Sequence, residues 1–191
     1  MKRISVKIAK ILLFTVCFAA AFWYFLDWQS IGTFLLTNAS SYASRNGTRI
    51  TFSGVSGTDS GFTVHNLSVN GRVSFTFSSL TITPRIIASI ANLSLVADLA
   101  FNDANVRFGQ TLNFGNGGMT GFARPSSVHV ENLRTNGDFS VSGTITYDVS
   151  TGRIARASAR LNMPPQWQEN ISLLQGYLPI VREGDNWYLR R

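Results

Sequence analysis

Few residues of this 191-residue chain have types and spacing suited to catalysis. Asp59-Ser60-Gly61 could present a serine nucleophile, but a catalytic serine needs a histidine placed against it and a buried acid behind that histidine. The chain has two histidines, His65 and His129, and each lies in a segment of alternating apolar and polar residues. Because turns rich in Ser and Thr often produce such tripeptides, we interpret this one as a turn and expect no enzyme activity.

Metal and cofactor chemistry also lacks a sequence signal. The nine acidic residues beyond position 28 are spread singly, and neither histidine has a cysteine or a cluster of acids near it. No ligand spacing typical of zinc and no glycine-rich phosphate loop is present. The single cysteine, Cys17, excludes an intrachain disulfide. We therefore predict no metal and no cofactor.

The positive charge is divided between two parts of the chain. The formal net charge is +7, and all three lysines, Lys2, Lys7 and Lys10, lie in the first ten residues. Every later cation is an arginine, and these arginines are scattered rather than arranged in a basic stripe with interleaved aromatic residues. This distribution argues against nucleic-acid binding. A mildly basic surface remains compatible with an anionic membrane.

The first structural element that the sequence predicts is an apolar N-terminal segment. Ile11–Leu26 is uncharged, follows the lysines, and ends in a cluster of Trp23, Tyr24 and Trp28. As a helix, Val6–Trp28 would span roughly 33 Å, enough for the hydrocarbon core of a bilayer. The preceding cations predict a cytoplasmic N-terminus and a periplasmic body. A cleaved signal peptide at Ala19-Ala20-Ala21 is the alternative, although the apolar run continues past these alanines.

The rest of the chain alternates with the period of a β-strand. Residues 139–149, F-S-V-S-G-T-I-T-Y-D-V, place apolar residues or Gly at every second position. Similar alternation, with slips of phase typical of β-bulges, recurs from Ile50 to Met163 and again near residues 186–190. We expect a short helix at 84–92 with Pro84 in its first position, a flexible turn at 115–118, and an amphipathic helix at 166–178.

Two segments of the alternating region are similar to each other. Residues 62–71, F-T-V-H-N-L-S-V-N-G, align without gaps with residues 128–137, V-H-V-E-N-L-R-T-N-G. Both predict a strand, a bulge, a second strand and a turn, which indicates a sheet extended by repetition. Chance similarity among strands rich in Ser, Thr and Asn is the alternative explanation.

The chain divides into an anchor at 1–28, a linker at 29–48 that could be helical, and a periplasmic β-sheet domain at 49–191. The fold class is all-β: a mostly antiparallel curved sheet, or a β-jellyroll-like groove, with one N-terminal transmembrane helix. The apolar face is too large to remain exposed to water. It forms either the dry core of a folded or paired sheet, or an open groove for a partner or acyl chains. The groove residues that we expect are Phe75, Phe77, Leu95, Phe101, Phe139, Val141, Ile145 and Tyr147.

Several segments together resemble a known family. They are G-F-T-V-H-N-L-S-V-N-G at 61–71, T-I-T-P-R-I-I-A-S-I at 81–90, P-P-Q-W-Q-E-N-I-S-L-L-Q-G-Y-L at 164–178 and G-D-N-W-Y-L at 184–189. With the N-terminal anchor, this pattern is similar to the type II secretion system protein N family (GspN) and the wider AsmA-like proteins. The resemblance implies an inner-membrane, single-pass protein with a periplasmic β-sheet groove. The small anchored β-jellyroll of the lipopolysaccharide exporter is the architectural comparison.

The resemblance also implies a function and a set of partners. We expect a non-enzymatic, membrane-anchored component of an envelope secretion or transport system, whose partners are the bilayer and secretion or envelope-assembly proteins. The AsmA-like alternative is a protein that binds lipid, such as phospholipid or lipopolysaccharide, and moves it between membranes through the apolar groove. Strand addition at an exposed sheet edge is a further way to bind a partner protein.

Overall fold

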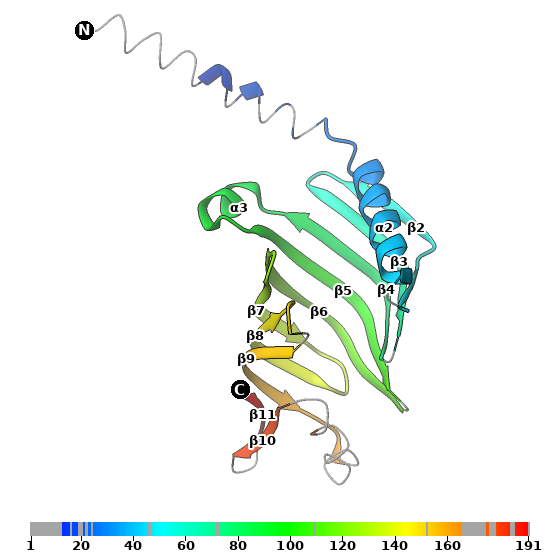
Figure 1. Ribbon diagram of the computed structural model, residues 1–191, viewed down its shortest axis with the longest axis vertical. Helices are drawn as coiled ribbons and strands as arrows, with labels where there is room; N and C mark the ends of the chain where they lie inside the picture. Colours follow the sequence, from blue (N-terminus) through cyan, green and yellow to red (C-terminus); the bar gives the residue numbers. More distant parts are fainter. Residues whose placement is uncertain are drawn as a thin grey trace, which may run out of the picture.

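The computed structural model describes residues 13–15, 17, 18, 21, 23, 25–45, 47–71, 73–108, 110–151, 153–165, 175, 179–183 and 186–190. Two helices and eleven strands account for most of these residues (Figure 1). In chain order they are α2 (Trp28–Arg45), β1 (Arg49–Thr51), β2 (Gly54–Thr58), β3 (Gly61–Asn70), β4 (Ser74–Pro84), α3 (Ile86–Asn92), β5 (Leu95–Phe108), β6 (Gln110–Arg124), β7 (Ser127–Thr135), β8 (Ser140–Asp148), β9 (Arg153–Asn162), β10 (Ile180–Glu183) and β11 (Asn186–Arg190).

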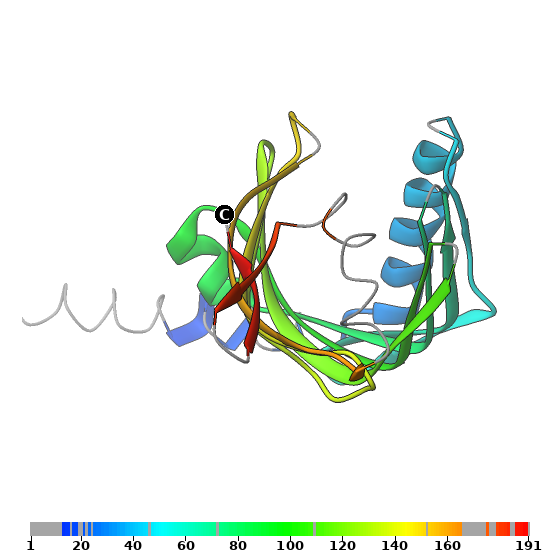
Figure 2. The same ribbon diagram turned by 90° about the horizontal axis from the view of Figure 1, so that it is seen from below.

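All the strands belong to one open, curved sheet. Its order is β1-β3-β4-β5-β6-β7-β8-β9-β11-β10, with β2 also paired to β3, and every pair is antiparallel. Seen from below, the sheet bends into a trough (Figure 2). The expectation of a mostly antiparallel curved sheet is confirmed. The jellyroll and sandwich alternatives are not, because every strand among the described residues belongs to this one sheet.

Local bulges accompany this curvature. Asn66 in β3, Asp103 in β5 and Asn132 in β7 have positive φ angles of 49°, 50° and 53°. Asn and Asp tolerate this left-handed region better than other side chains, apart from glycine. Asn66 and Asn132 occupy equivalent positions in the two similar segments, so these segments share a left-handed residue as well as a sequence pattern, while a register shift accompanies only Asn132. The phase slips at these positions are therefore confirmed as backbone irregularities.

The glycine-rich segment at 115–118 is not a turn, contrary to the expectation from its composition. It lies inside β6, where Gly117 pairs with Phe101 of β5 and with Thr135 of β7. A Cβ atom on Gly117 would lie 2.6 Å from Cζ of Phe101 and 2.3 Å from the carbonyl oxygen of Arg134. Glycine is present here because the Phe101 ring lies against the strand backbone, which leaves no space for a side chain.

The helix expected at 84–92 is confirmed as α3, with one change at its start. Pro84 is the last residue of β4 and pairs with Ala97 of β5, and the helix begins at Ile86. Residues 29–45, which the sequence places in a linker, form most of α2. This helix packs against β1, β2 and β3 on the inner side of one wall of the trough (Figure 2). The linker segment is therefore largely part of the folded body.

The N-terminal anchor and one further helix fall largely on residues that the structure does not describe. Within the described residues, no helix combines the length and the apolar character that a membrane crossing requires. Only some positions of the apolar run 11–26 belong to that set. The amphipathic helix expected at 166–178 lies outside the described residues except for Gln175.

Candidate functional site

An apolar groove occupies the concave face of the sheet between β4 and β8. Its volume is about 530 Å³, which lies in the range typical of ligand pockets. All of its described lining residues are apolar except Thr135. They are Val73, Phe75, Phe77, Phe101, Ala104, Val106, Leu112, Phe114, Met119, Leu133, Thr135, Val141, Ile145 and Leu189.

Strand pairing brings these side chains together from distant parts of the chain. Phe75 of β4 pairs with Val106 of β5, and Val106 pairs with Leu112 of β6. Directly paired residues in an antiparallel sheet point to the same face, so each such row adds apolar surface to one side. The rings of Phe77 and Phe101 meet edge to face with centroids 5.8 Å apart. The groove surface is therefore built by long-range pairing rather than by one loop.

The single polar lining residue does not offer a free hydrogen-bonding group. The Thr135 hydroxyl donates to the carbonyl oxygen of Phe139 at 3.2 Å and accepts from the backbone N–H of Val141 at 2.8 Å. Because both roles of this hydroxyl are already filled, the groove presents hydrocarbon to an occupant. Recognition in such a site depends on shape and apolar contact more than on hydrogen bonds.

The helix α2 sets one limit of the groove. Trp28 of α2 forms a buried cluster with Phe62, Val64 and Leu67 of β3, and Ile31 and Leu36 pack against the same cluster. Gly32 permits this close approach, because a Cβ there would lie 2.6 Å from Cδ2 of Phe62. Among the described residues, α2 thus covers the concave face beside β1, β2 and β3 and does not extend over the groove.

A second buried cluster closes the opposite limit. Val141, Ala159, Leu161, Trp187 and Leu189 are all less than 10% exposed and belong to this cluster. They come from β8, β9 and β11, which are neighbours in the sheet. The groove therefore lies between two packed regions and is supported on both sides.

The structure brings together six of the eight predicted groove residues. Phe75, Phe77, Phe101, Val141 and Ile145 line the groove directly. Phe139 is 2% exposed and packs behind it, with its ring centroid 5.9 Å from that of Phe114.

Leu95 and Tyr147 lie outside the groove. Leu95 is 76% exposed at the start of β5 beside α3, and Tyr147 is 41% exposed near the end of β8. Both follow the alternation that predicted them, but each lies close to a strand end, beyond the part of the trough where the walls are near. Alternation identifies the face of a residue and not its distance from the centre of the sheet.

The predicted set omits nine of the fourteen lining residues, and two of the omissions, Met119 and Leu189, have different reasons. Met119 follows the glycines at 115–118, and reading those glycines as a turn ended the alternation too early. Leu189 belongs to β11, which inserts between β9 and β10. Its pairing with Ala159 is not sequential in the chain, so the local pattern carried no sign of it.

The residues considered for catalysis do not form a catalytic group around Asp59-Ser60-Gly61. His65 pairs with Gly54, and its Nε2 lies 2.9 Å from Oγ of Ser56. Asp59 and Ser60 form the turn between β2 and β3. The reading of this tripeptide as a turn is confirmed.

His129 has a hydroxyl on one side and a carboxylate on the other. Its Nδ1 lies 2.8 Å from Oγ1 of Thr146 and its Nε2 lies 3.1 Å from Oε1 of Glu131. His129 and Glu131 share a face because they are two residues apart in β7, a relation that the sequence displayed. About two fifths of each of these two side chains is exposed, and neither lines the groove. We interpret this cluster as a cross-strand polar contact.

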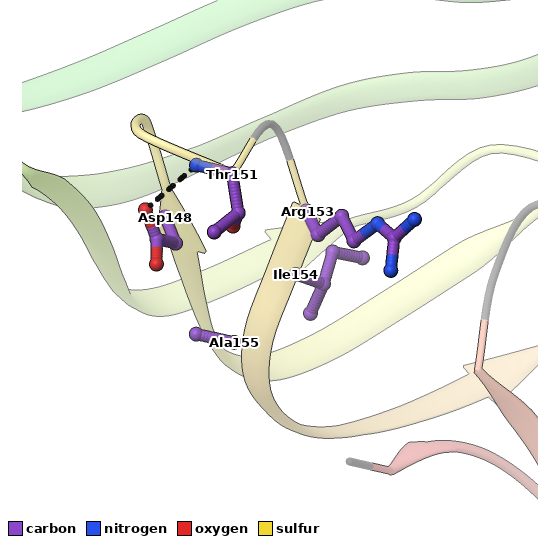
Figure 3. Close-up of a pocket in the computed structure, with 5 residues that line it drawn as sticks. All are labelled: Asp148, Thr151, Arg153, Ile154 and Ala155. Carbon is purple, nitrogen blue, oxygen red and sulfur yellow. Dashed lines mark hydrogen bonds between the residues drawn. The ribbon is translucent and has the colours of Figure 1, made fainter.

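The turn between β8 and β9 forms a separate small pocket of about 420 Å³ (Figure 3). Asp148 Oδ1 accepts hydrogen bonds from the Ser150 hydroxyl at 2.6 Å, the Ser150 N–H at 2.8 Å and the Thr151 N–H at 3.1 Å. These bonds, led by the Ser150 hydroxyl, hold the pKa of Asp148 below its ordinary value of 3.8. The carboxylate therefore stabilises the turn while it is ionised.

No group of three or more His, Cys, Asp or Glu side chains suited to a metal ion occurs within the described part of the chain. Compared with the pocket at the β8–β9 turn and the recess beside α3, the groove has the most uniformly apolar lining. What the arrangement offers is a binding surface for hydrocarbon, positioned by the sheet and bounded by α2.

Comparison with known proteins identifies one family. The family model described as "Type II secretion system protein GspN-like, Synergistales" matches residues 5–191, which is nearly the whole chain. No curated protein and no solved structure matches significantly.

Proposed function

This chain belongs to the GspN-like family of type II secretion system proteins, and we propose that it serves that system as a non-enzymatic, membrane-anchored envelope component that binds a partner in its apolar groove. The family membership supports the secretion system. The groove supports binding rather than catalysis, because the residues around it offer hydrocarbon surface. The AsmA-like relationship that the sequence suggested has no support from the family match.

The single observation that carries the proposal is the open apolar surface itself. Phe75 is 39% exposed in the absence of an occupant, beside Phe77, Val106 and Leu133. Covering a side chain of this size contributes about 1.5–3 kcal/mol when burial is complete. An occupant that covered several of them would bind with useful affinity even after the entropy cost of association. We propose that the occupant is an apolar segment of another secretion protein.

The position of the body relative to the membrane is part of the same proposal. The uncharged run 11–26 follows Lys2, Arg3, Lys7 and Lys10 in the sequence. This order favours an inner-membrane anchor with the sheet in the periplasm. Residues 23 and 26 pack beside Trp28 in the α2 cluster, so the chain leaves the apolar run directly into the folded body.

Site-specific photo-crosslinking in cells tests the proposal. A photoreactive amino acid in place of Phe75 would face the groove, and the same amino acid in place of exposed Thr76 would face the opposite side of β4. We expect the first position to capture an identified type II secretion protein and the second to capture it at least about ten-fold less. Equal capture at both positions, or capture at neither, would contradict groove binding.

The lining, which is apolar except for Thr135, also favours a second candidate, which is binding of acyl chains. Mass spectrometry of lipids extracted from the purified protein would test it, with Phe77→Asp as the variant and Thr76→Asp as the matched control. Lipid that copurifies with the wild-type protein and with Thr76→Asp, but not with Phe77→Asp, would support lipid as the occupant. A clean extract from all three proteins would count against lipid.

A further inference from the structure

The helix α3 and the start of β5 form an exposed apolar tip at one end of the sheet. Within ten residues, five large apolar side chains remain in solvent: Ile86 (47%), Ile87 (87%), Ile90 (71%), Leu93 (89%) and Leu95 (76%). Residues 86–97 contain no charged side chain. An exposed apolar cluster of this density marks a surface that meets a partner or a membrane.

Several polar groups at the C-terminal end of α3 have internal partners, which lowers the cost of entering a lipid environment. The N–H of Leu93 donates to the carbonyl oxygen of Ile90, and the N–H of Ser94 donates to that of Ser89. The Ser89 hydroxyl accepts from the N–H of Val96 at 2.9 Å, and the Asn92 amide donates to the carbonyl oxygen of Ala88 at 2.8 Å. Polar groups that already have partners enter the headgroup and acyl region at much lower cost than unpaired ones.

Leu93 supports the same interpretation through its backbone. It adopts the left-handed conformation, with φ 47° and ψ 43°, at the C-terminus of α3. Glycine or asparagine is usual there, and a leucine accepts local strain. The Leu93 side chain is also the most exposed of the five.

The tip and the apolar N-terminal run meet the body at the same end of the sheet. Trp28, at the start of α2, packs on Phe62, and Phe62 pairs with Ile82 of β4. Ile82 is two residues before the end of β4, after which α3 begins. Figure 1 shows the start of α2 and α3 at the same end of the sheet. A bilayer that held residues 11–26 would therefore lie next to α3.

Two arginines lie at the base of the tip. Arg85 immediately precedes α3 and lies 3.6 Å from Asp98, and Arg124 donates to the carbonyl oxygen of Asn92 at 3.3 Å. Arginines next to an apolar tip suit contact with anionic phospholipid headgroups when isoleucines enter the acyl boundary. The recess between α3 and the β6–β7 turn, lined by Ile90, Leu95 and Arg124, continues this surface.

We propose that the α3 tip inserts into the outer leaflet of the same membrane that holds the N-terminal run, and so fixes the tilt of the sheet on the bilayer. The inference goes beyond the proposed function, which assigns nothing to α3, and rests on it only for the location of the membrane. The occupant is a phospholipid surface rather than a protein, because residues 86–97 are uncharged, five large apolar side chains among them are exposed, and the patch lies at the same end of the sheet as the apolar run.

Fluorescence quenching in vesicles tests the proposal with the full-length chain. In a Cys17→Ser background, Ile87→Cys carries a polarity-sensitive label, and Gln110→Cys carries the same label as the control. Gln110 begins β6 at the other end of the long hairpin, roughly 40 Å along the strand from α3. The vesicles contain phosphatidylethanolamine and phosphatidylglycerol, with a quencher attached to the lipid acyl chains.

We expect about two-fold quenching of the label at position 87 and none at position 110, since an interfacial helix lies at the acyl boundary. Adding Ile90→Asp should lower the quenching at 87 to the control value. Absence of quenching at 87, or quenching that persists with Ile90→Asp, would overturn the proposal. A label that is shielded in native membranes but reports water in purified vesicles would assign the tip to a protein partner instead.

Extraction of the same vesicles with alkaline carbonate separates this proposal from the proposed anchor. A chain that resists extraction but shows no quenching at 87 would support the proposed anchor and contradict the α3 contact. A chain that is quenched at 87 but is extracted by carbonate would support the α3 contact and contradict the proposed anchor. A chain that never associates with the vesicles would contradict both the anchor and the α3 contact.

Discussion

The two similar segments of this sheet lie in different surroundings. In β3, Phe62, Val64 and Leu67 of the first segment pack against α2 and are 6% exposed or less. In β7, the equivalent Val128, Val130 and Leu133 are only half-buried, and Leu133 lines the groove. Nearly the same alternation is therefore a dry core in one place and an open surface in the other. The difference arises from α2, a segment outside either repeat.

The largest expected effect comes from truncating equivalent leucines. Leu67→Ala should lower the free energy of unfolding by about 3 kcal/mol, because it leaves a cavity beneath α2. Leu133→Ala should lower it by only about 1 kcal/mol, because the groove is already open. Denaturant unfolding of both variants measures the difference. Equal losses would mean that the groove is covered in solution.

Overpacking beneath α2 tests whether this helix is the cover. Gly32→Leu places a side chain where a Cβ alone lies 2.6 Å from the Phe62 ring, so we expect a loss of about 2 kcal/mol. Ala39→Leu on an exposed position of the same helix is the control and should be close to neutral. We also expect more binding of an apolar dye by Gly32→Leu alone. Unchanged dye binding would show that α2 remains seated.

Asn66 and Asn132 should respond alike to substitution, because the strain at each left-handed residue is local. Asn66→Ala and Asn132→Ala each place alanine at a left-handed φ, and we expect each to cost about 1 kcal/mol. Asn132→Gly should recover most of that loss, because glycine adopts this conformation freely. Asn66 also donates to the Ser53 hydroxyl at 3.0 Å, so glycine should recover less there. Thermal melts of the four variants give the comparison.

The smallest expected effect concerns the turn between β8 and β9, which carries Asp148. Because the folded-state pKa of Asp148 lies below its ordinary value of 3.8, its ionised form stabilises the fold at pH values above 3.8. This contribution is lost as the pH falls through the folded-state pKa. Asp148→Asn should therefore melt slightly below the wild type at neutral pH and together with it in strong acid. Ser150→Ala should behave similarly, and an acid-only difference would contradict the assignment.

Most of the sheet could be predicted from the sequence, because period-two alternation and the Asn-Gly pairs at 70–71 and 136–137 are local signals. The segment 115–118 was wrongly predicted to be a turn, because a glycine-rich sequence looks the same whether it lies in a strand or in a turn. Only the Phe101 ring, which lies on the paired strand, distinguishes them. The packing of α2 on β3 was not predicted for a related reason. Residues 29–45 lack a strong apolar stripe, and their contact with β3 depends on the space that Gly32 leaves for the Phe62 ring.

The strand order has a consequence for how the chain folds. From β3 to β9 each strand pairs with the next along the chain, so every step closes a short loop at low entropic cost. The pairing of Leu161 with Trp187 is different, because β11 must return past β10 to reach β9. Such an order lets the meander form quickly from neighbouring hairpins. The C-terminal hairpin would dock last, and with it Leu189 would complete the wall of the groove.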